Sequence, residues 1–344
     1  MRSICVLRLS AIGDVCHAVS AVQSIQRHDP GVSITWVMGK VEAQLLQGLP
    51  GVRLVVFDKR QGWRAYSQLR ADLRGERFDV LLHMQVAFRA NLASAFIRAR
   101  RKIGFDWRTA KELHALFMRE RTPVLSQPHV LEAFAQFARA IGVPAQAPLW
   151  DMPLTQADRD WAREVLQTSG GQRHLLICAA ASAAERNWLP ERYAALAQHA
   201  VSQGFAVHLC GGPAEAEQTL AQAIQAHCPN PLFNHVGQTR LPQLLALIAQ
   251  ASLVLAPDTG PAHMATTVGT PVIGLYGHSN PARTGPYGSP YVVEVYHQHL
   301  LAQTGKTAEQ LPWGTRVKGP DVMASIQVTT VCDMFDRVVR EHNL

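Results

Sequence analysis

The chain has 344 residues, 47% of them hydrophobic and 17% charged, a composition typical of a folded α/β protein with two domains and not of a disordered chain. No run of eighteen apolar residues is present, and charged residues interrupt the first apolar stretch, so we expect neither a membrane-spanning helix nor a signal peptide. The formal net charge of +7 is unevenly distributed: residues 1–150 hold 21 Lys and Arg against 11 Asp and Glu, and the remainder holds 12 against 15.

The basic first half predicts an anionic partner on that side of the molecule. Modules that bind nucleic acids through interleaved aromatic and basic residues are not evident, so we expect no nucleic acid but a phosphorylated lipid headgroup or an anionic membrane surface. A solvated basic face without a partner is the alternative. The six cysteines form no CxxC pair, which is typical of a reduced, cytoplasmic protein without a zinc site.

Four apolar segments in the first half alternate with helical periodicity, which is the βαβ pattern of a parallel sheet. These predicted strands read SICVLRL, VSITWVM, VRLVVF and FDVLLHMQ. After the first strand the chain reads SAIGDV instead of GxGxxG, which argues against a nicotinamide or flavin cofactor. The Pro- and Ala-rich stretch Val143–Leu154 breaks the periodicity and is the predicted linker, so we expect a first domain over residues 1–150.

The βαβ pattern restarts after the linker and predicts a second domain over residues 151–328. Its expected strands read HLLICAA, FAVHLCGG, LVLAPDTG and PVIGLYG. Rossmann-like halves of this kind bind ligands at the carboxyl ends of their strands. Residues 291–328 form a long segment of irregular pattern, and residues 329–344 are predicted to form a final helix.

The loop after the first predicted strand carries a candidate general base, Asp14. Gly13 before it lets the backbone approach a ligand closely, and a carboxylate at this position can take a proton from a substrate hydroxyl. Ser10 and His17 flank the loop and are candidates for orienting the substrate. As the alternative, Asp14 caps the helix that begins near Val15.

Basic residues gather in two places in the first half. Lys59, Arg60 and Arg64 follow the third predicted strand, beside Trp63 and Tyr66. The second cluster contains Arg98, Arg100, Arg101, Lys102, Arg108 and Lys111. A lone basic side chain is usually solvated, but several in the domain that holds Asp14 favour a site for an anionic acceptor.

The stretch from Ala256 to Gly288 reads as strand, turn, helix, strand and Gly/Pro-rich loop. Asp258 and Thr259 follow the strand, and Gly260 with the proline after it begins the helix, a favoured place for proline. The free N–H groups and the positive dipole end of such a helix hold phosphate, and His263 lies one turn further on. The alternative is an ordinary helix cap with a surface histidine.

Four segments together resemble the bacterial ADP-heptose:lipopolysaccharide heptosyltransferases, glycosyltransferase family 9. In chain order they are LRLSAIGDVCHAVSAVQSI, GFDWRTAKELHALF, ERNWLPERYAALA and DTGPAHMATTVGTPVIGLYGHSNPARTGPYG. The second resembles more narrowly the acceptor side of heptosyltransferase I, the type that adds heptose to Kdo of the inner core. The segment 291–328 departs from the shorter tail of those enzymes and leaves the exact donor and acceptor open.

This resemblance implies the GT-B fold: two Rossmann-like α/β domains whose parallel sheets face a central cleft, with the final helix returning to the N-terminal domain. It implies inverting transfer of heptose from ADP-heptose to Kdo-lipid A with Asp14 as the base, and no cofactor beyond the donor substrate. It also implies a cytoplasmic protein, peripheral on the inner membrane. No clustered acidic pair such as DxD is evident, so we expect transfer without a metal.

On the donor side, the resemblance implies that Arg186 and Ser182 hold the leaving diphosphate, together with the pocket at Asp258, Thr259, Gly260 and His263. Glu215 could accept hydrogen bonds from ribose hydroxyls, or be an ordinary acid at a helix start. On the acceptor side, Lys111 falls at the matching position of its motif, and Arg64 aligns more loosely.

Three other functions are compatible with the same residues. The first is a family member that uses heptose as acceptor or another nucleotide sugar. The second is a GT-B sugar-nucleotide epimerase, which would need no lipid acceptor. The third is a non-catalytic nucleotide-binding protein that docks on membranes through its basic half.

Overall fold

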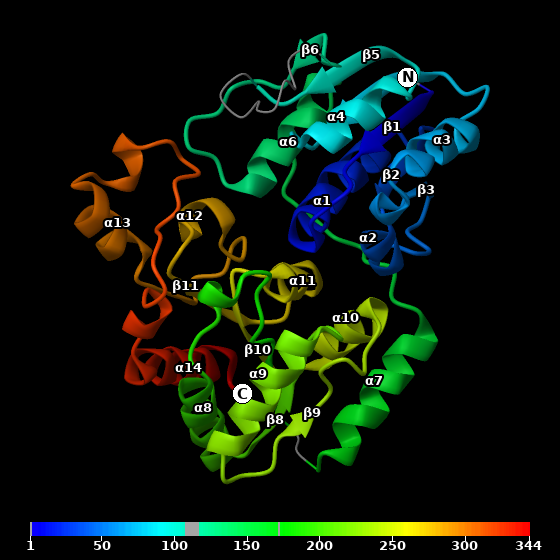
Figure 1. The fold of residues 1–344 in the computed structure, drawn as a ribbon. Coiled ribbons are helices and arrows are strands. Elements are labelled where there is room, and N and C mark those ends of the chain that lie inside the picture. The colour runs from blue at the N-terminus through cyan, green and yellow to red at the C-terminus, as the bar shows by residue number, and fades with distance from the viewer. Residues whose placement is uncertain (1, 107–116, 171–172) are drawn as a thin grey trace. The chain divides into compact units, whose positions relative to one another are not determined.

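The computed structural model describes residues 2–106, 117–170 and 173–344, which form two compact units, residues 1–153 and 154–344 (Figure 1). The boundary lies inside the Pro- and Ala-rich stretch of the sequence. Each unit contains a six-stranded sheet, and the strand pairs of both sheets are parallel, as the α/β prediction requires. No described helix is long and apolar enough to cross a bilayer.

The first unit has the strand order β3-β2-β1-β4-β5-β6. Its strands are β1 (Ser3–Leu7), β2 (Ser33–Gly39), β3 (Val52–Phe57), β4 (Phe78–His83), β5 (Ala99–Gly104) and β6 (Glu120–Arg121). Its described helices are α1 (Ile12–His28), α2 (Lys40–Leu45), η1 (Lys59–Gln61), α3 (Trp63–Asp72), α4 (Phe88–Ala95) and α6 (Val130–Ala140). Strand β1 is buried from Ile4 to Leu7 between β2 and β4, because helices cover both faces of a parallel sheet.

The second unit has the order β12-β11-β10-β7-β8-β9. Its strands are β7 (Arg173–Ile177), β8 (Phe205–Leu209), β9 (Phe233–Asn234), β10 (Leu253–Pro257), β11 (Val272–Tyr276) and β12 (Val292–Glu294). Its larger described helices are α7 (Gln156–Thr168), α8 (Pro190–Ser202), α9 (Glu215–His227), α10 (Leu241–Gln250), α11 (Gly260–Val268), α13 (Tyr296–Thr304) and α14 (Val328–His342). Short helical turns are η2 (Ala184–Arg186), α12 (Pro281–Thr284), η3 (Ala308–Gln310) and η4 (Met323–Ser325).

Helix α11 has clear sequence signals at both ends. Pro261 occupies its first turn, where a missing N–H costs nothing. Gly269 ends it with φ of 76°, a left-handed conformation that glycine adopts without a steric penalty. The strands on either side, β10 and β11, are fully buried, so α11 starts at a fixed point on the sheet.

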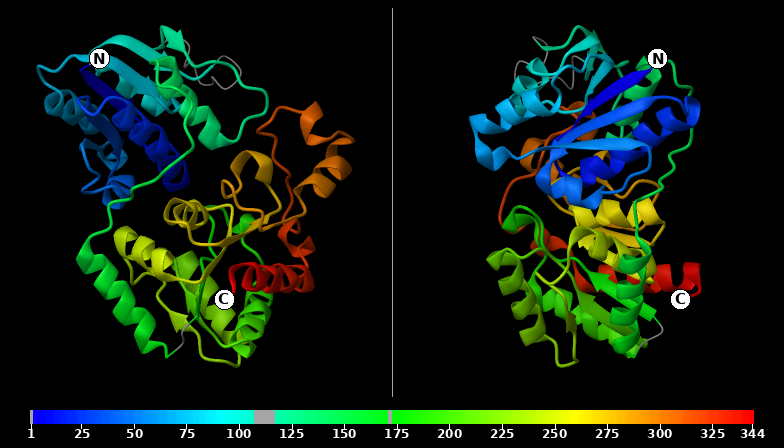
Figure 2. Two further views of the ribbon diagram at one scale, coloured as in Figure 1. Left: turned by 180° about the vertical axis from the view of Figure 1, so that it is seen from behind. Right: turned by 90° about the vertical axis from the view of Figure 1, so that its right-hand side faces the viewer.

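Helix α14 belongs to the second unit. Its apolar residues Val331, Phe335 and Val338 are buried in the core that also contains Phe205, and the Phe335 and Phe205 ring centres are 5.1 Å apart. The α14 ribbon, drawn in red, lies beside α8 (Figure 2). At its edge, Asp336 Oδ1 lies 2.7 Å from His199 Nε2 of α8. The apolar face of this helix packs in the core beside α8 and β12, and the expectation that the helix also returns to the N-terminal domain stays a prediction.

The segment 291–328, of irregular pattern in the sequence, contains defined elements. It includes β12, α13, η3 and η4, and residues 296–322, which we call the C-terminal insert, have a small core of their own. That core consists of Tyr296, Leu300, Ala308, Val317 and Val322. The Tyr296 hydroxyl also donates a hydrogen bond to the Thr315 carbonyl, 2.9 Å away, so the insert is held together internally.

Candidate active site

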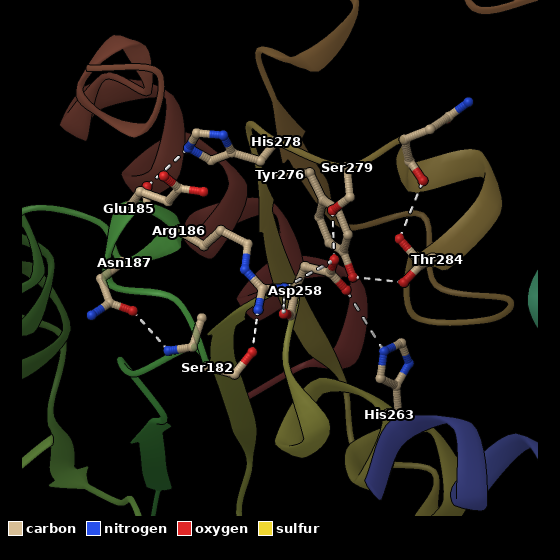
Figure 3. Close-up of polar contacts among 12 residues, drawn as sticks. Ser182, Glu185, Arg186, Asn187, Asp258, His263, Tyr276, His278, Ser279 and Thr284 are labelled. Atoms are coloured by element: carbon tan, nitrogen blue, oxygen red, sulfur yellow. Dashed lines mark hydrogen bonds and ion pairs between the residues drawn. The ribbon is translucent and has the colours of Figure 1, made fainter. Parts of the chain in front are cut away.

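Three loops of the second unit meet at one edge of its sheet. They follow β7, β10 and β11, which are neighbours in the sheet, so the carboxyl ends of these parallel strands lie together. The loops bring Arg186, Asp258 and Ser279 into contact (Figure 3). Ser279 was not among the residues predicted from the sequence.

The carboxylate of Asp258 is the centre of this cluster. Ser279 Oγ donates to its Oδ2 over 2.5 Å, and Arg186 Nη1 lies 3.7 Å from the same oxygen. Arg186 Nη1 also donates to the Asp258 carbonyl at 3.3 Å, and His263 Nε2 lies 4.0 Å from Oδ1. The structure thus brings together three of the predicted donor-side residues, Arg186, Asp258 and His263 (Figure 3).

Arg186 has further contacts within its own loop. Its Nη2 donates to Ser182 Oγ, so the predicted pair of a cation and a hydroxyl is adjacent. Asn187 Oδ1 accepts a hydrogen bond from Ala181 N at 2.7 Å and closes the loop. Arg186 Nε is buried and has no hydrogen-bond partner among the described residues, which is unusual for a charged donor.

The start of α11 carries no side-chain cap. Thr259 is the N-cap residue, in an extended conformation with φ of −150°, and its side chain makes no capping hydrogen bond. The carboxylate of Asp258 is engaged by Ser279 and Arg186. Pro261 has no N–H and Ala262 N donates to the Thr259 carbonyl at 3.2 Å, so Gly260 supplies the N–H at this helix start that no side-chain cap occupies, the kind of group that binds phosphate oxygens.

The loop after β8 is held by Glu217, and a ribose contact of Glu215 stays a prediction. Glu215 is exposed in the first turn of α9. Glu217 Oε2 accepts a hydrogen bond from Gly212 N at 2.6 Å, and a Cβ on Gly211 would lie 2.8 Å from the same oxygen. The motif GGPAEAE contains both acids, and their spacing alone did not distinguish them.

In the first unit, Asp14 forms an ion pair with Arg8. Helix α1 begins at Ile12, earlier than expected, so Asp14 lies in its first turn, and Ala11 is the N-cap residue. Arg8 Nη2 donates to Asp14 Oδ2 and Arg8 Nη1 donates to the Met84 carbonyl at 2.6 Å. Burial lowers the pKa of Arg8, and the Asp14 carboxylate opposes that shift. Sequence reasoning missed Arg8, which lies six residues before its partner.

Other predicted residues around this loop are fixed by β4 and α6. Gln85, which follows β4, accepts a hydrogen bond from Leu9 N at 2.7 Å and approaches Ser10 Oγ at 3.4 Å. His17 is buried, and its ring meets the ring of His129 edge-on at 5.3 Å. Gly13 is buried in the first turn of α1. The backbone before Asp14 is therefore held in place on both sides.

The first basic cluster borders a groove of about 510 Å³ between η1, α3 and α4. Trp63 and Phe88 at this groove are 74% and 52% exposed. Its lining residues are Phe57, Lys59, Gly62, Trp63, Tyr66, Ala87, Phe88, Arg89 and Leu92. The predicted Arg60 and Arg64 are exposed next to it. Phe88 and Arg89 come from α4 and were missed, because nothing in the local sequence connects them to Lys59.

The second basic cluster is largely engaged in holding the sheet. Arg101 forms an ion pair with Glu120 at 2.6 Å, and Lys102 Nζ donates to the Ser94 carbonyl at 2.7 Å. Burial lowers the pKa of Lys102, because a charged ammonium group beside the sheet is partly removed from water. The predicted Arg108 and Lys111 lie outside the described residues.

Comparison with known proteins extends over nearly the whole chain. The model of glycosyltransferase family 9 (heptosyltransferase) matches residues 66–313. The lipopolysaccharide core heptosyltransferase OpsX of Haemophilus influenzae is 44% identical over 338 residues, which cover 98% of this chain and 97% of that protein.

Two solved structures share the fold. A family 9 glycosyl transferase from Veillonella parvula has a TM-score of 0.82 at 20% identity and covers 99% of this chain and 97% of its own. The Escherichia coli heptosyltransferase WaaC with ADP has a TM-score of 0.73 at 20% identity, covering 98% of this chain and 99% of its own. These matches confirm the predicted GT-B fold and family, and the chain belongs to glycosyltransferase family 9 and is a glycosyltransferase.

Proposed function

We propose that the protein is an inverting lipopolysaccharide core heptosyltransferase, which transfers heptose from ADP-heptose to Kdo of Kdo-lipid A with Asp14 as the general base. The observation that carries the proposal is the Arg186–Asp258 pair at the uncapped start of α11. It occurs in a chain 44% identical to a lipopolysaccharide core heptosyltransferase. The distant relative WaaC has been solved with ADP, which supports an ADP-sugar donor.

The donor diphosphate is proposed to bind between the start of α11 and Arg186. The Gly260 N–H donates to a phosphate oxygen, and the buried Nε of Arg186 gains the partner that it lacks. His263 adds a donor from the next turn. A fixed cation and helix N–H groups stabilise the negative charge that develops on the departing ADP.

Asp258 has a different part in this proposal from the other donor-side residues. A carboxylate repels a diphosphate, so direct contact between the two is unfavourable. Its contacts with Arg186 and Ser279 instead orient the guanidinium. We therefore assign Asp258 to holding Arg186 in place.

The transfer itself is a single displacement. Asp14 takes the proton from the acceptor hydroxyl as that oxygen bonds to the anomeric carbon, and the bond from this carbon to the diphosphate breaks, releasing ADP. Arg8 holds Oδ2 of Asp14, which leaves Oδ1 to receive the proton. One carboxylate suffices for inversion, since a second is needed as nucleophile only in a retaining reaction.

The acceptor is proposed to bind over the first unit. The groove combines the cations Lys59 and Arg89 with exposed Trp63 and Phe88, which suits an anionic sugar attached to a lipid. The lipid tail would stay in the bilayer, so we infer a cytoplasmic protein peripheral on the inner leaflet.

The test is ADP release from ADP-heptose, with and without Kdo-lipid A, in EDTA. Release that depends on the acceptor and survives the chelator supports the donor, the acceptor and metal independence together. Among the described residues no group of three or more His, Cys, Asp and Glu is arranged to hold a metal ion, and the chelator tests the remaining chain as well.

The other outcomes separate the alternative functions. ADP release only with a heptose-bearing core acceptor would indicate that the enzyme adds its sugar to heptose and not to Kdo. Release of free sugar or epimer without any acceptor would indicate an epimerase. ADP binding without turnover on any acceptor would indicate a non-catalytic protein.

A further inference from the structure

The turn Gly277–Asn280 joins the donor-side site to the C-terminal insert. It follows β11, and its residues His278, Ser279 and Asn280 are all buried. A Cβ on Gly277 would lie 2.8 Å from Met323 Sδ, so glycine is what allows the segment after the insert to pack closely here. The turn therefore contacts both the donor-side residue Asp258, through Ser279, and the segment that follows the insert, through Gly277.

His278 uses both ring nitrogens in these contacts. Nε2 lies 2.9 Å from the Glu185 carbonyl (Figure 3). Nδ1 lies 3.0 Å from the Val317 carbonyl. The His278 carbonyl in turn accepts a hydrogen bond from Val317 N at 3.1 Å. The residue is only 3% exposed, so water does not readily replace these bonds.

His278 is linked to both members of the donor-side ion pair, to Arg186 through a contact of its ring and to Asp258 through the next residue in the chain. Glu185 directly precedes Arg186 in η2, and its carbonyl is what His278 holds. Ser279, next to His278 in the chain, donates to Asp258. One turn thus fixes the backbone that carries the arginine and the side chain of the aspartate.

We propose that His278 is a positioning residue for Arg186, which locks the η2 loop to the C-terminal insert and so makes the insert part of the donor site. This inference rests on the proposed function, because it takes Arg186 to bind the donor diphosphate. The insert has its own apolar core, so it provides a stiff support. Without the ring nitrogens, the backbone of η2 loses its contact at the Glu185 carbonyl, and Arg186 samples positions that miss the diphosphate.

The experiment measures ADP affinity by calorimetry in a double-mutant cycle. His278→Phe keeps an aromatic ring and removes both ring nitrogens, and Arg186→Ala removes the group it is proposed to position. We expect H278F to weaken ADP binding about tenfold in the native background. In the R186A background we expect H278F to change the affinity by less than about twofold, because residues that act as a unit are not additive.

Two further variants separate positioning from general loss of structure. His278→Gln retains an amide donor and is expected to regain part of the lost affinity, and it serves in the cycle if H278F does not fold. His299→Phe is the matched control. It removes the 2.9 Å contact between His299 Nε2 and Ser325 Oγ, which does not involve η2. We expect this variant to leave ADP affinity unchanged.

Each result decides one question. Equal losses from H278F in both backgrounds, or no loss in the native one, overturn the positioning role while the donor site stands. An equal loss in H299F shows that the insert acts only through overall stability and also overturns it. A native protein that does not bind ADP overturns the proposed donor site itself.

Discussion

At the scale of single residues, two ion pairs between an arginine and an aspartate organise the proposed chemistry, Arg8–Asp14 and Arg186–Asp258. In both, the arginine Nε is buried and has no hydrogen-bond partner among the described residues. The surroundings differ, because Arg8 is also fixed by the Met84 carbonyl and lies 5.3 Å from the Phe134 ring centre. In the proposed function, the first pair holds a carboxylate for the acceptor and the second holds a cation for the donor.

The role of Asp14 gives the first prediction. Asp14→Asn keeps the shape and removes the base, so we expect the turnover number to fall at least about 100-fold. ADP affinity should stay unchanged, since the proposal assigns Asp14 to the acceptor and not to the donor. Both are measured on the same preparation, by ADP release and by calorimetry.

The matched control for this change is Asp72→Asn, an exposed aspartate on α3 of the same unit. It should leave turnover unchanged. If D14N transfers heptose at the native rate, Asp14 is not the base, and the Arg8–Asp14 pair serves only to shape the loop.

At the scale of elements, helix α14 stabilises the second unit through one face. Phe335 is fully buried and packs on Phe205, so Phe335→Ala removes a large side chain from a core that cannot fully collapse. We expect a loss of about 3–5 kcal/mol in the free energy of unfolding, measured by urea denaturation. Leu301→Ala on α13, where the native side chain is 52% exposed, is the control and should change it by less than about 0.5 kcal/mol.

A row of histidines crosses the edge of the second sheet. His174 on β7 and His235 after β9 both contact the ring of His208 on β8, with nitrogen separations of 3.2 and 3.1 Å. Burial lowers the pKa of His208 from 6.5 to about 3, and the two neighbouring histidines add to this. Between pH 6.5 and about 3, His208 therefore stays neutral in the folded protein but is protonated in the unfolded chain.

The sign of the resulting pH dependence follows from that difference. Above pH 6.5 neither state carries the proton and His208 contributes no pH dependence. As the pH falls from 6.5 toward about 3, only the unfolded chain gains it, so stability is lost by up to about 1.4 kcal/mol per pH unit. Denaturation between pH 4 and 7 should show a smaller slope for His208→Gln than for the native protein. The exposed His227→Gln should keep the native slope, and equal slopes in all three would contradict the assignment.

At the scale of the whole molecule, the excess of positive charge in residues 1–150 predicts binding to anionic membranes. Vesicles that contain phosphatidylglycerol should sediment the native protein at low salt and release it as ionic strength rises, because exposed charges are screened. Neutral phosphatidylcholine vesicles are the control. The double variant R60E/R64E should bind less, and binding insensitive to salt would argue for an apolar mode of attachment.

The sequence allowed the fold to be predicted where burial leaves a continuous signal. Strands such as β10 and β11 are apolar throughout because both faces are covered, and the start of α11 is marked by its Gly-Pro pair. For α14 the sequence shows an apolar face but not which core receives it. That choice depends on residues such as Phe205, far away in the chain.

The candidate site was predicted where a residue lies in a motif and missed where it is defined by a distant partner. Asp258 and His263 stand in one recognisable turn. Arg8, Glu217 and His278 act by reaching backbone or side chains whose positions only the folded chain reveals. Arg101 and Lys102 show the reverse error, since they look available in the sequence but are engaged by Glu120 and Ser94.

Both sheets have the same connectivity, and this has a consequence for how the enzyme can change. In each, the chain runs outward from a central strand and then returns to the other side of it, so the order reverses between β1 and β4 and between β7 and β10. Ligand sites of such folds form where the order reverses. Asp14 lies after β1, and Arg186 and Asp258 lie after β7 and β10. The proposal thus assigns proton removal and leaving-group departure to equivalent places in two compact units. Acceptor preference can therefore diverge by changes in one unit while the nucleotide chemistry of the other is preserved.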